Sequence, residues 1–258
     1  MANVISFISS KGGVAKSTST VEVATVFQNM GYRVLVIDLD ENSSLSKNIG
    51  AELNTKKTIY EVLHGRINVF DAIQKHDLFD IITGSKSLSL VAQEFIDRDD
   101  VYLMLDLMDI LKDDYDFIFI DNAPSRSLLL TMTYIATDYA IIPTVCDESS
   151  TDMVIETEKD INALVNNRHH DSHAKVIGYI LTWYNKRTNM HYAALDKLQV
   201  LANQKEVPPF VMTAAAAIIA SEVKTLHTAI CRKYKSSKIG RNYYNIAEEI
   251  IKRIKEDM

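Results

Sequence analysis

The residues best suited to chemistry lie near the start of the 258-residue chain, in the segment FISSKGGVAKSTS at positions 7–19. Glycines such as Gly12 and Gly13, which lack a Cβ, let backbone N–H groups converge on phosphate oxygens. Lys16 can reach the outer phosphates of a nucleotide, and the hydroxyl of Ser17 can bind Mg²⁺. The spacing approaches the phosphate-loop pattern G-x-x-x-x-G-K-[ST], although two positions of that pattern differ. A structural Gly-Gly turn with a solvated lysine is the alternative for this segment taken alone.

Three carboxylates follow apolar runs in two later segments, VLVIDLDENSS and YDFIFIDNAPS. Asp38 and Asp40 end the first run, and Asp121 ends the second. Parallel strands bring such residues to the carboxyl edge of a sheet, where open α/β sheets bind ligands. Carboxylates at that edge suit Mg²⁺ binding, directly or through water. A single aspartate at a strand end more commonly caps a helix or forms a turn. The three segments together favour a nucleotide and Mg²⁺ site.

Seven short runs rich in β-branched residues predict the strands that would position these side chains. Most of the runs are continuously apolar, which is typical of strands buried on both faces of a parallel sheet. The predicted strands are Val4–Ile8, Arg33–Ile37, Phe79–Ile82, Phe117–Ile120, Tyr139–Pro143, Val176–Leu181 and Phe210–Met212. Segments of helical period, including Ser17–Met30 and Thr151–Asn166, alternate with these strands.

This alternation predicts an α/β fold with a single doubly wound, mostly parallel sheet and helices on both faces. Val4–Ile8, the tight turn after it and Ser17–Met30 give the strand–loop–helix context that a phosphate loop needs. No Pro-, Gly- or Ser-rich linker and no internal repeat interrupts the pattern, so we expect residues 1–258 to form one domain. The least regular region, Asn54–Val91, is interpreted as an inserted helical subregion.

The composition fits a globular protein, with 47% hydrophobic and 24% charged residues. A net charge of −6 gives no indication that the chain as a whole binds nucleic acid. The two cysteines, Cys146 and Cys231, lie far apart, which disfavours a metal cluster or a disulfide framework. No apolar run is long enough to span a bilayer and no signal peptide is present, so we expect a cytoplasmic protein.

A local excess of positive charge interrupts this acidic background between Val223 and Ala247, where no acidic residue occurs. Besides His227, the stretch contains six cations: Lys224, Arg232, Lys233, Lys235, Lys238 and Arg241. Such a stretch is typical of sequence-independent binding to the phosphate backbone of nucleic acid. A solvated loop and helix end is the alternative for a charge run considered alone.

The last helical segment, Tyr243–Lys255, places Ile246, Ile250 and Ile254 on one stripe. Its polar face carries two i,i+4 pairs of opposite charge, Glu248–Lys252 and Glu249–Arg253. A helix that lies on a membrane would instead carry a mainly Lys/Arg polar face and bulkier aromatic anchors. We therefore expect this helix to pack on the core.

Six segments spread over the chain resemble the deviant-Walker ATPases of the ParA/Soj partition family, whose wider relatives include MinD. They read KGGVAKST, VLVIDLDEN, YDFIFIDNAPS, IIPTVCDESS, LTWYNKRTN and RNYYNIAEEIIKRI. The most specific element is Lys11, since the family's extra lysine opens the loop at this position. The fifth segment falls where the family contacts the nucleotide base, although its Trp183 also suits a core position. The resemblance implies ATP and Mg²⁺ as cofactors.

The resemblance also implies a role for each residue of the site. In the family the first lysine of the loop reaches the partner's nucleotide in an ATP-sandwich dimer, which implies ATP-dependent homodimerisation. Lys11, Lys16 and Asp40 are the expected catalytic residues, with Asp40 positioning the attacking water. The expected nucleotide-binding residues are Lys11, Gly12, Gly13, Val14, Ala15, Lys16, Ser17 and Thr18. Mg²⁺ is expected at Ser17, Asp38 and Asp121, the last being the Walker B carboxylate.

Ala15 is the main departure from the family's pattern, because a glycine there can adopt positive φ and lets the backbone approach phosphate. If the loop requires left-handed geometry, alanine costs about 1–2 kcal/mol, which is roughly a tenfold loss of affinity. We therefore expect a nucleotide site that is weakened and not abolished. Glu41–Asn42 and Asn122–Ala123 also replace the family's usual residues but leave the carboxylates in place.

The function implied by the resemblance is that of a DNA-partition ATPase, cytoplasmic and nucleoid-associated, without stable membrane association. ParA-like ATPases bind double-stranded DNA nonspecifically as ATP dimers through this C-terminal region. Slow hydrolysis, stimulated by a ParB-like centromere-binding partner, resets them. Two alternatives stay open: a MinD-like positioning ATPase on a membrane, and a scaffold without hydrolysis, which Ala15 suggests. Asp40 argues against the scaffold, which needs no water-positioning carboxylate. Whether the cargo is a plasmid or a chromosome stays open.

Overall fold

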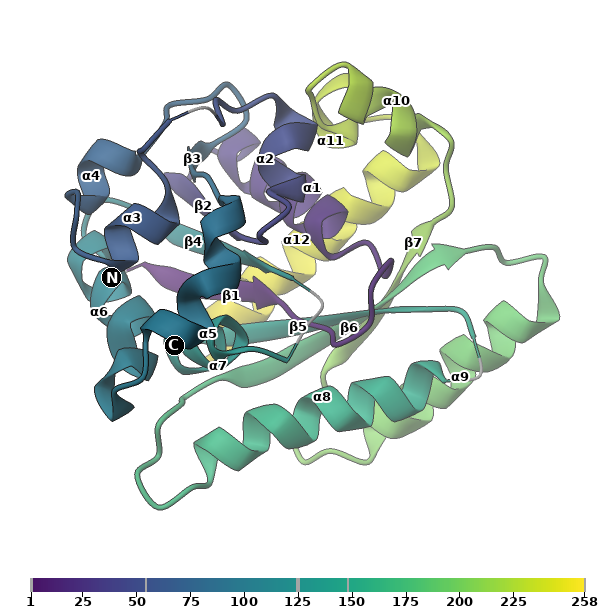
Figure 1. Ribbon diagram of the computed structural model, residues 1–258. Coiled ribbons are helices and arrows are strands. Elements are labelled where there is room, and N and C mark those ends of the chain that lie inside the picture. Colours follow the sequence, from purple (N-terminus) through teal and green to yellow (C-terminus); the bar gives the residue numbers. More distant parts are fainter. Residues whose placement is uncertain (1, 54, 124–125, 148, 258) are drawn as a thin grey trace.

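The computed structural model describes residues 2–53, 55–123, 126–147 and 149–257 (Figure 1). Its centre is a seven-stranded sheet with the order β3-β2-β4-β1-β5-β6-β7. The strands are β1 (Asn3–Phe7), β2 (Val34–Leu39), β3 (Asp80–Ile82), β4 (Phe117–Asn122), β5 (Tyr139–Val145), β6 (Lys175–Tyr184) and β7 (Phe210–Ala215). Each pair of neighbouring strands is parallel, so the carboxyl ends of all seven meet at one edge.

Helices connect the strands and cover both faces of the sheet (Figure 1). They are α1 (Lys16–Asn29), α2 (Ser44–Ile49), α3 (Ile59–Leu63), α4 (Val69–Ala72), α5 (Val91–Glu94), α6 (Leu103–Leu111), α7 (Leu128–Ala136), α8 (Ser150–Val165), α9 (Asn189–Asn203), α10 (Ile219–Thr225), α11 (Ile230–Lys233) and α12 (Lys238–Asp257). The 3₁₀ turns Lys86–Leu90 and Arg98–Tyr102 precede α5 and α6. In Figure 1, α11 and the start of α12 lie beside α1, although α1 is distant from them in sequence, and α10 lies next to α11 and α2.

The continuously apolar strands are buried on both faces, as β2 illustrates. Val34 and Val36 pack into a core shared with α1 and α12. Leu35 and Ile37 pack into a second core shared with α3 and α6. Because successive side chains of a strand point to opposite faces, only a run without polar residues can serve both cores. The predicted doubly wound α/β fold is confirmed.

All seven predicted strands are present, but several continue further toward the carboxyl edge than predicted. β6 ends at Tyr184 and β7 at Ala215. The interpretation of Asn54–Val91 as an inserted helical subregion is only partly right. Residue 54 lies outside the described residues, and the rest contains α3 and α4 but also β3, which pairs with β2 and forms the edge of the sheet.

The last helix packs on the core as predicted, but it begins earlier. Ile246, Ile250 and Ile254 are buried. α12 starts at Lys238 and not at Tyr243, with the Ser237 hydroxyl accepting a hydrogen bond from the Gly240 N–H at 3.1 Å. The Glu249–Arg253 pair is present at 2.8 Å, whereas the structure pairs Lys252 with Glu249 and Glu256 and not with Glu248. Of the described helices, none has the length and apolar character needed to cross a membrane.

Candidate functional site

The turn between β1 and α1 carries the glycine-rich loop to the carboxyl edge of the sheet (Figure 1). Gly12 and Gly13 are exposed at its tip, and Gly13 has φ 77°, a conformation that favours glycine. Open space surrounds the position that a Cβ of Gly13 would occupy. Behind the tip, Val14 is buried and its carbonyl accepts a hydrogen bond from the Thr182 hydroxyl at 3.3 Å. The loop is therefore fixed at its base and open at its tip.

Ala15 has left-handed backbone geometry, with φ 62° and ψ 32°, immediately before α1. Ala15 therefore has the left-handed backbone geometry that strains an alanine. Its carbonyl accepts a hydrogen bond from the Ser19 N–H at 2.8 Å, which starts the helix. Alanine in this region costs about 1–2 kcal/mol relative to a residue that tolerates it.

Lys16 begins α1 and is buried at the site. Its Nζ donates a hydrogen bond to the carbonyl oxygen of Lys11 at 3.0 Å, so the amine is turned back over the loop. Burial lowers the pKa of Lys16, while the nearby carboxylates of Asp121 and Asp40 act in the opposite direction. The structure therefore brings together Lys16 and two of the three predicted carboxylates.

Asp38 and Asp121 lie side by side because β2 and β4 are neighbours, and the two residues are paired in register. Both are fully buried, and desolvation raises the pKa of each carboxyl. Asp38 already accepts hydrogen bonds from the Ser46 N–H at 2.9 Å, the Ser46 hydroxyl at 2.6 Å and the Asp40 N–H at 3.1 Å. Both carboxylate oxygens of Asp38 therefore already have hydrogen-bond donors within the fold.

Asp121 differs from Asp38 in having an unsatisfied oxygen. Its Oδ1 accepts a long hydrogen bond of 3.4 Å from the Thr20 hydroxyl. Its Oδ2 is buried and has no hydrogen-bond partner in the part of the chain that the structure describes. The Ser17 hydroxyl and Lys16 lower the pKa of Asp121, although less than burial raises it. An orphaned carboxylate oxygen beside a hydroxyl fits a cation or its bound water.

Asp40 follows β2 and is mostly buried. Its Oδ1 accepts hydrogen bonds from the backbone N–H of Asn42 at 2.9 Å and from its side-chain amide at 3.2 Å. Asn42 is one of the residues that depart from the family's usual pattern, and here it fixes the orientation of this carboxylate. Among the described residues, no group of three or more His, Cys, Asp or Glu is arranged to hold a metal. A Mg²⁺ ion held by one or two protein groups and phosphates needs no such group.

Lys11 lies at the mouth of the loop and forms an ion pair with Asp147, just after β5. Its Nζ also donates to the Ser149 hydroxyl at 3.3 Å. The segment IIPTVCDESS contains both partners, yet spacing alone gave no reason to connect them with Lys11 across more than a hundred residues. This contact holds Lys11 within its own chain.

A small cavity of about 60 Å³ lies beside the loop and is lined in part by Ala15, Thr18 and Trp183. Trp183 is 49% exposed, so the alternative that it is a core residue is wrong. Ser17 and Thr18 are partly exposed at the start of α1. Ala15 and Thr18 therefore line an opening beside the loop at the carboxyl edge.

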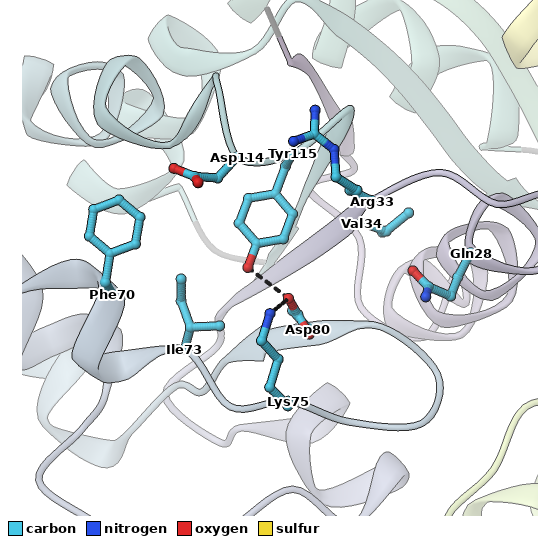
Figure 2. A pocket seen from close by; sticks show the side chains of 9 residues that line it. All are labelled: Gln28, Arg33, Val34, Phe70, Ile73, Lys75, Asp80, Asp114 and Tyr115. Atoms are coloured by element: carbon cyan, nitrogen blue, oxygen red, sulfur yellow. Dashed lines mark hydrogen bonds and ion pairs between the residues drawn. The ribbon is translucent and has the colours of Figure 1, made fainter.

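A larger cavity, of about 440 Å³, lies at the opposite edge of the sheet. Figure 2 shows Asp80 in this larger cavity. Its carboxylate accepts hydrogen bonds from the Lys75 amine at 2.5 Å and from the Tyr115 hydroxyl at 2.8 Å. Arg33, also at its wall, is bonded to Asp116. Because Lys75 and Arg33 in its wall already pair with the carboxylates of Asp80 and Asp116, this cavity does not compete with the loop as a phosphate site.

The six predicted DNA-contacting cations are all exposed. Five of them lie on α10, α11 and the start of α12, and Lys235 lies between α11 and α12; we call residues 224–241 the basic segment. The ammonium of Lys235 lies over the ring of Tyr244, 4.5 Å from its centroid, and Arg232 donates to Asn29 of α1 at 3.3 Å. The alternative of a solvated loop and helix end is consistent with these positions, since the exposed cations occupy helix ends and the turn between α11 and α12. α11 and α12 also pack against α1.

Comparisons with known sequences place the chain among ATPases. A family model described as an AAA domain matches residues 2–172. An uncharacterised protein of Methanocaldococcus jannaschii is 30% identical over 217 residues, covering 77% of this chain and 80% of that protein. The sporulation initiation inhibitor protein Soj of Bacillus subtilis is 24% identical, with 77% of this chain and 79% of Soj covered. The chromosome partitioning protein ParA of Caulobacter vibrioides is 28% identical, with 72% of each chain covered.

Solved structures share the fold along almost the whole chain. Cyanthece apo McdA has a TM-score of 0.84 at 16% identity, covering 97% of this chain and 100% of that one. Cobyrinic acid a,c-diamide synthase from Mycobacterium smegmatis, with bound ADP and magnesium, has a TM-score of 0.80 at 22% identity, covering 100% and 97%. A plasmid partition protein from Borrelia burgdorferi has a TM-score of 0.78 at 22% identity, covering 98% and 99%. At these identities the likeness shows the fold alone.

Proposed function

The chain belongs to the ParA/MinD superfamily of P-loop ATPases, and we propose that within it the chain is a DNA-partition ATPase. Residues 1–258 act as one domain that binds ATP, dimerises around it, binds double-stranded DNA nonspecifically and is reset by slow hydrolysis. A ParB-like centromere-binding protein stimulates that hydrolysis. The observation that carries the proposal is the exposed basic segment, which packs on the helix that begins at the phosphate loop.

The loop supplies the phosphate-binding groups. Backbone N–H groups around Gly12 and Gly13 face the phosphates, and Lys16 moves from the carbonyl of Lys11 to the β- and γ-phosphates. Ser17 and Asp121 would hold Mg²⁺, which supplies charge neutralisation of the phosphates when bound. This assignment is supported by the orphaned Oδ2 of Asp121. Asp38, whose oxygens are already satisfied, fits an orienting role better than a direct contact with the ion.

Hydrolysis is assigned to Asp40. Its Oδ1 is held by Asn42, and its Oδ2 receives no hydrogen bond from the described residues, so Oδ2 can accept one from the attacking water. A carboxylate fixed on one side and available on the other orients a nucleophile without a further rearrangement. An Asp40 carboxylate available to orient water also argues against the alternative that the protein is a nucleotide-binding scaffold that does not hydrolyse ATP.

Dimerisation around the nucleotide is assigned to the carboxyl edge. Lys11 would exchange its own Asp147 for the partner's nucleotide, and a partly exposed ion pair of this kind costs only about 0–1 kcal/mol to break. Three large apolar side chains at or beyond the carboxyl ends of β6 and β7 are about half or more exposed: Trp183, near the end of β6, Met190 and Ile218. Exposed apolar side chains near a site suit burial in an interface.

The MinD-like alternative requires a helix that can lie on a membrane. The apolar stripe of α12 is instead buried against the sheet, with Ile246 and Ile250 fully buried. The remaining faces carry both acidic and basic residues, such as Glu249 and Arg253. This arrangement supports DNA and not lipid as the surface that the ATPase binds.

Co-sedimentation tests the proposal. The protein is incubated with Mg²⁺-ATP and either random duplex DNA or anionic liposomes, and ATP turnover is measured in parallel. We expect the protein to pellet with DNA only when ATP is present and to hydrolyse ATP slowly. Lys16→Ala should lose both behaviours, because it removes the main phosphate-binding cation. Pelleting with liposomes but not with DNA would transfer the assignment to the MinD-like alternative.

A further inference from the structure

A carboxylate in the middle of α1, nearly two turns beyond Lys16, is buried. Glu22 is 1% exposed, and its two oxygens accept hydrogen bonds from successive backbone N–H groups, those of Ile230 and Cys231, at 2.8 Å each. These two N–H groups begin α11, which carries Arg232 and Lys233. The side chain of Glu22 thus joins the phosphate-loop helix to the basic segment.

Two further side chains on the same face of α1 contact this part of the chain. The Ser19 hydroxyl is hydrogen-bonded to the Tyr243 hydroxyl at 3.1 Å. The Asn29 amide donates to the Tyr244 hydroxyl at 3.3 Å and accepts from Arg232. Positions 19, 22 and 29 share one helical face, since they are spaced by one and then two turns. The face that begins beside Lys16 therefore holds the basic segment along its length.

We propose that Glu22 is a positioning residue for DNA binding, whose carboxylate fixes the basic segment to the phosphate-loop helix. This inference rests on the proposed function, since it concerns how the DNA-binding cations are held. Neither ATP nor DNA contacts Glu22, which acts through the backbone of Ile230 and Cys231. Through this contact a shift of α1 on nucleotide binding or dimerisation moves the cations as one unit.

The contact depends on the two acceptor oxygens of the Glu22 carboxylate. A carboxylate has two acceptor oxygens, whereas a glutamine amide has one acceptor oxygen and an NH₂ that would face a second N–H. Burial raises the pKa of Glu22 to about 7, which means that the charged form costs the folded state free energy. Glu22→Gln would leave one of the two buried N–H groups without an acceptor.

The test compares Glu22→Gln with Thr25→Val, a control on the same helix that removes only the intrahelical bond from the Thr25 hydroxyl to the Val21 carbonyl. At pH 8 with Mg²⁺-ATP, we expect Glu22→Gln to bind random duplex DNA at least about threefold more weakly, because a smaller fraction of molecules holds the cations in place. ATP affinity should match the parent, because Glu22 lies outside the phosphate loop. Hydrogen exchange at the amides of Ile230 and Cys231 should accelerate. Thr25→Val should leave DNA binding and these amides unchanged.

Several outcomes would overturn the inference. Parent-like DNA affinity in Glu22→Gln, with the parent binding DNA, would remove Glu22 from DNA binding while leaving the proposed function standing. Equal losses of DNA and ATP binding, or a loss matched by Thr25→Val, would show a general structural role. A parent that binds no DNA would overturn the proposed function together with this inference. If Glu22→Gln does not fold, Glu22→Asp replaces it; its shorter side chain withdraws the acceptors from the two amides, and parent-like DNA binding despite faster exchange of these amides contradicts the proposal.

Discussion

At the scale of single residues, the phosphate loop contains an alanine at a point where its backbone turns left-handed. Ala15 has φ 62°, whereas the loop's other positive-φ residue, Gly13, is a glycine that adopts φ 77° without strain. From the sequence, Ala15 could be identified as a departure from the phosphate-loop pattern, and the energetic cost of a left-handed alanine could be predicted. That Ala15 is in fact left-handed could not be predicted, because a local sequence pattern does not fix φ at one residue. The Ala15 methyl also lines the small cavity beside Thr18 and Trp183, so it occupies space next to the nucleotide opening.

Replacing Ala15 with glycine should strengthen ATP binding. Relief of the left-handed strain of about 1–2 kcal/mol corresponds to a dissociation constant up to about tenfold lower. Titration with a fluorescent ATP analogue measures the effect. The matched variant Gly13→Ala introduces the same strain elsewhere in the loop and should weaken binding. Unchanged affinity in Ala15→Gly would show that the loop has adapted to alanine.

Replacing Asp40 with alanine should separate nucleotide binding from hydrolysis. Its carboxylate can orient water through Oδ2 and is held by Asn42, so ATP binding and dimerisation should persist while turnover falls by roughly 100-fold or more. Single-turnover hydrolysis and light scattering with ATP measure the two properties. The control Asn42→Ala should lower turnover less, because it removes only the group that orients Asp40. A monomeric Asp40→Ala protein in ATP would contradict this division of roles.

At the scale of elements, α1 does more than the sequence predicted. The strand–loop–helix pattern predicted its position to within one residue and its phosphate-binding end. The contact between Glu22 and α11 was not predicted from the sequence, because a glutamate on a helix normally faces solvent. Its partners in α11 also lie more than 200 positions away. Similarly, the first turn of α12 was not predicted, since Lys238 and Arg241 resemble a solvated loop and the stripe of isoleucines begins only at Ile246. Contacts of this kind depend on tertiary structure and leave no local pattern.

The buried carboxyl of Glu22 predicts a pH dependence of stability. Its pKa is about 7 in the folded protein against an ordinary value of 4.5, so the folded state holds the proton more tightly. The free energy of unfolding that Glu22 contributes is therefore highest below about pH 4.5 and is lost as the pH rises through about 7. Relative to Glu22→Gln, which does not titrate, the parent should lose up to about 3 kcal/mol between pH 4.5 and pH 8. Urea unfolding at several pH values measures the difference, and a constant difference would contradict the assigned pKa.

At the scale of the whole molecule, the parallel sheet explains why sites from distant segments meet. Apolar strands alternating with helices predicted the fold, and parallel pairing then forced Asp38 and Asp121 to one edge. The sequence could not show that β7 and α10–α12 return to α1, because nothing in a charge run specifies which helix it packs against. This return brings the phosphate loop and the basic segment together on one helix. On the proposed function, ATP bound at one end of α1 should therefore govern DNA binding by the cations beside this helix.

The most direct measurement is fluorescence anisotropy with random duplex DNA, with and without Mg²⁺-ATP, across a salt series. The parent should bind tightly only with ATP, and its affinity should fall steeply with salt as counterions are released. Replacing Arg232, Lys233 and Lys235 by alanine should weaken binding to every duplex alike, with the salt slope reduced by about one for each lost phosphate contact. The control replaces three exposed lysines elsewhere, Lys56, Lys57 and Lys197, and should bind as the parent does. DNA binding that is absent with ATP at low salt, or equal with and without ATP, would contradict the account.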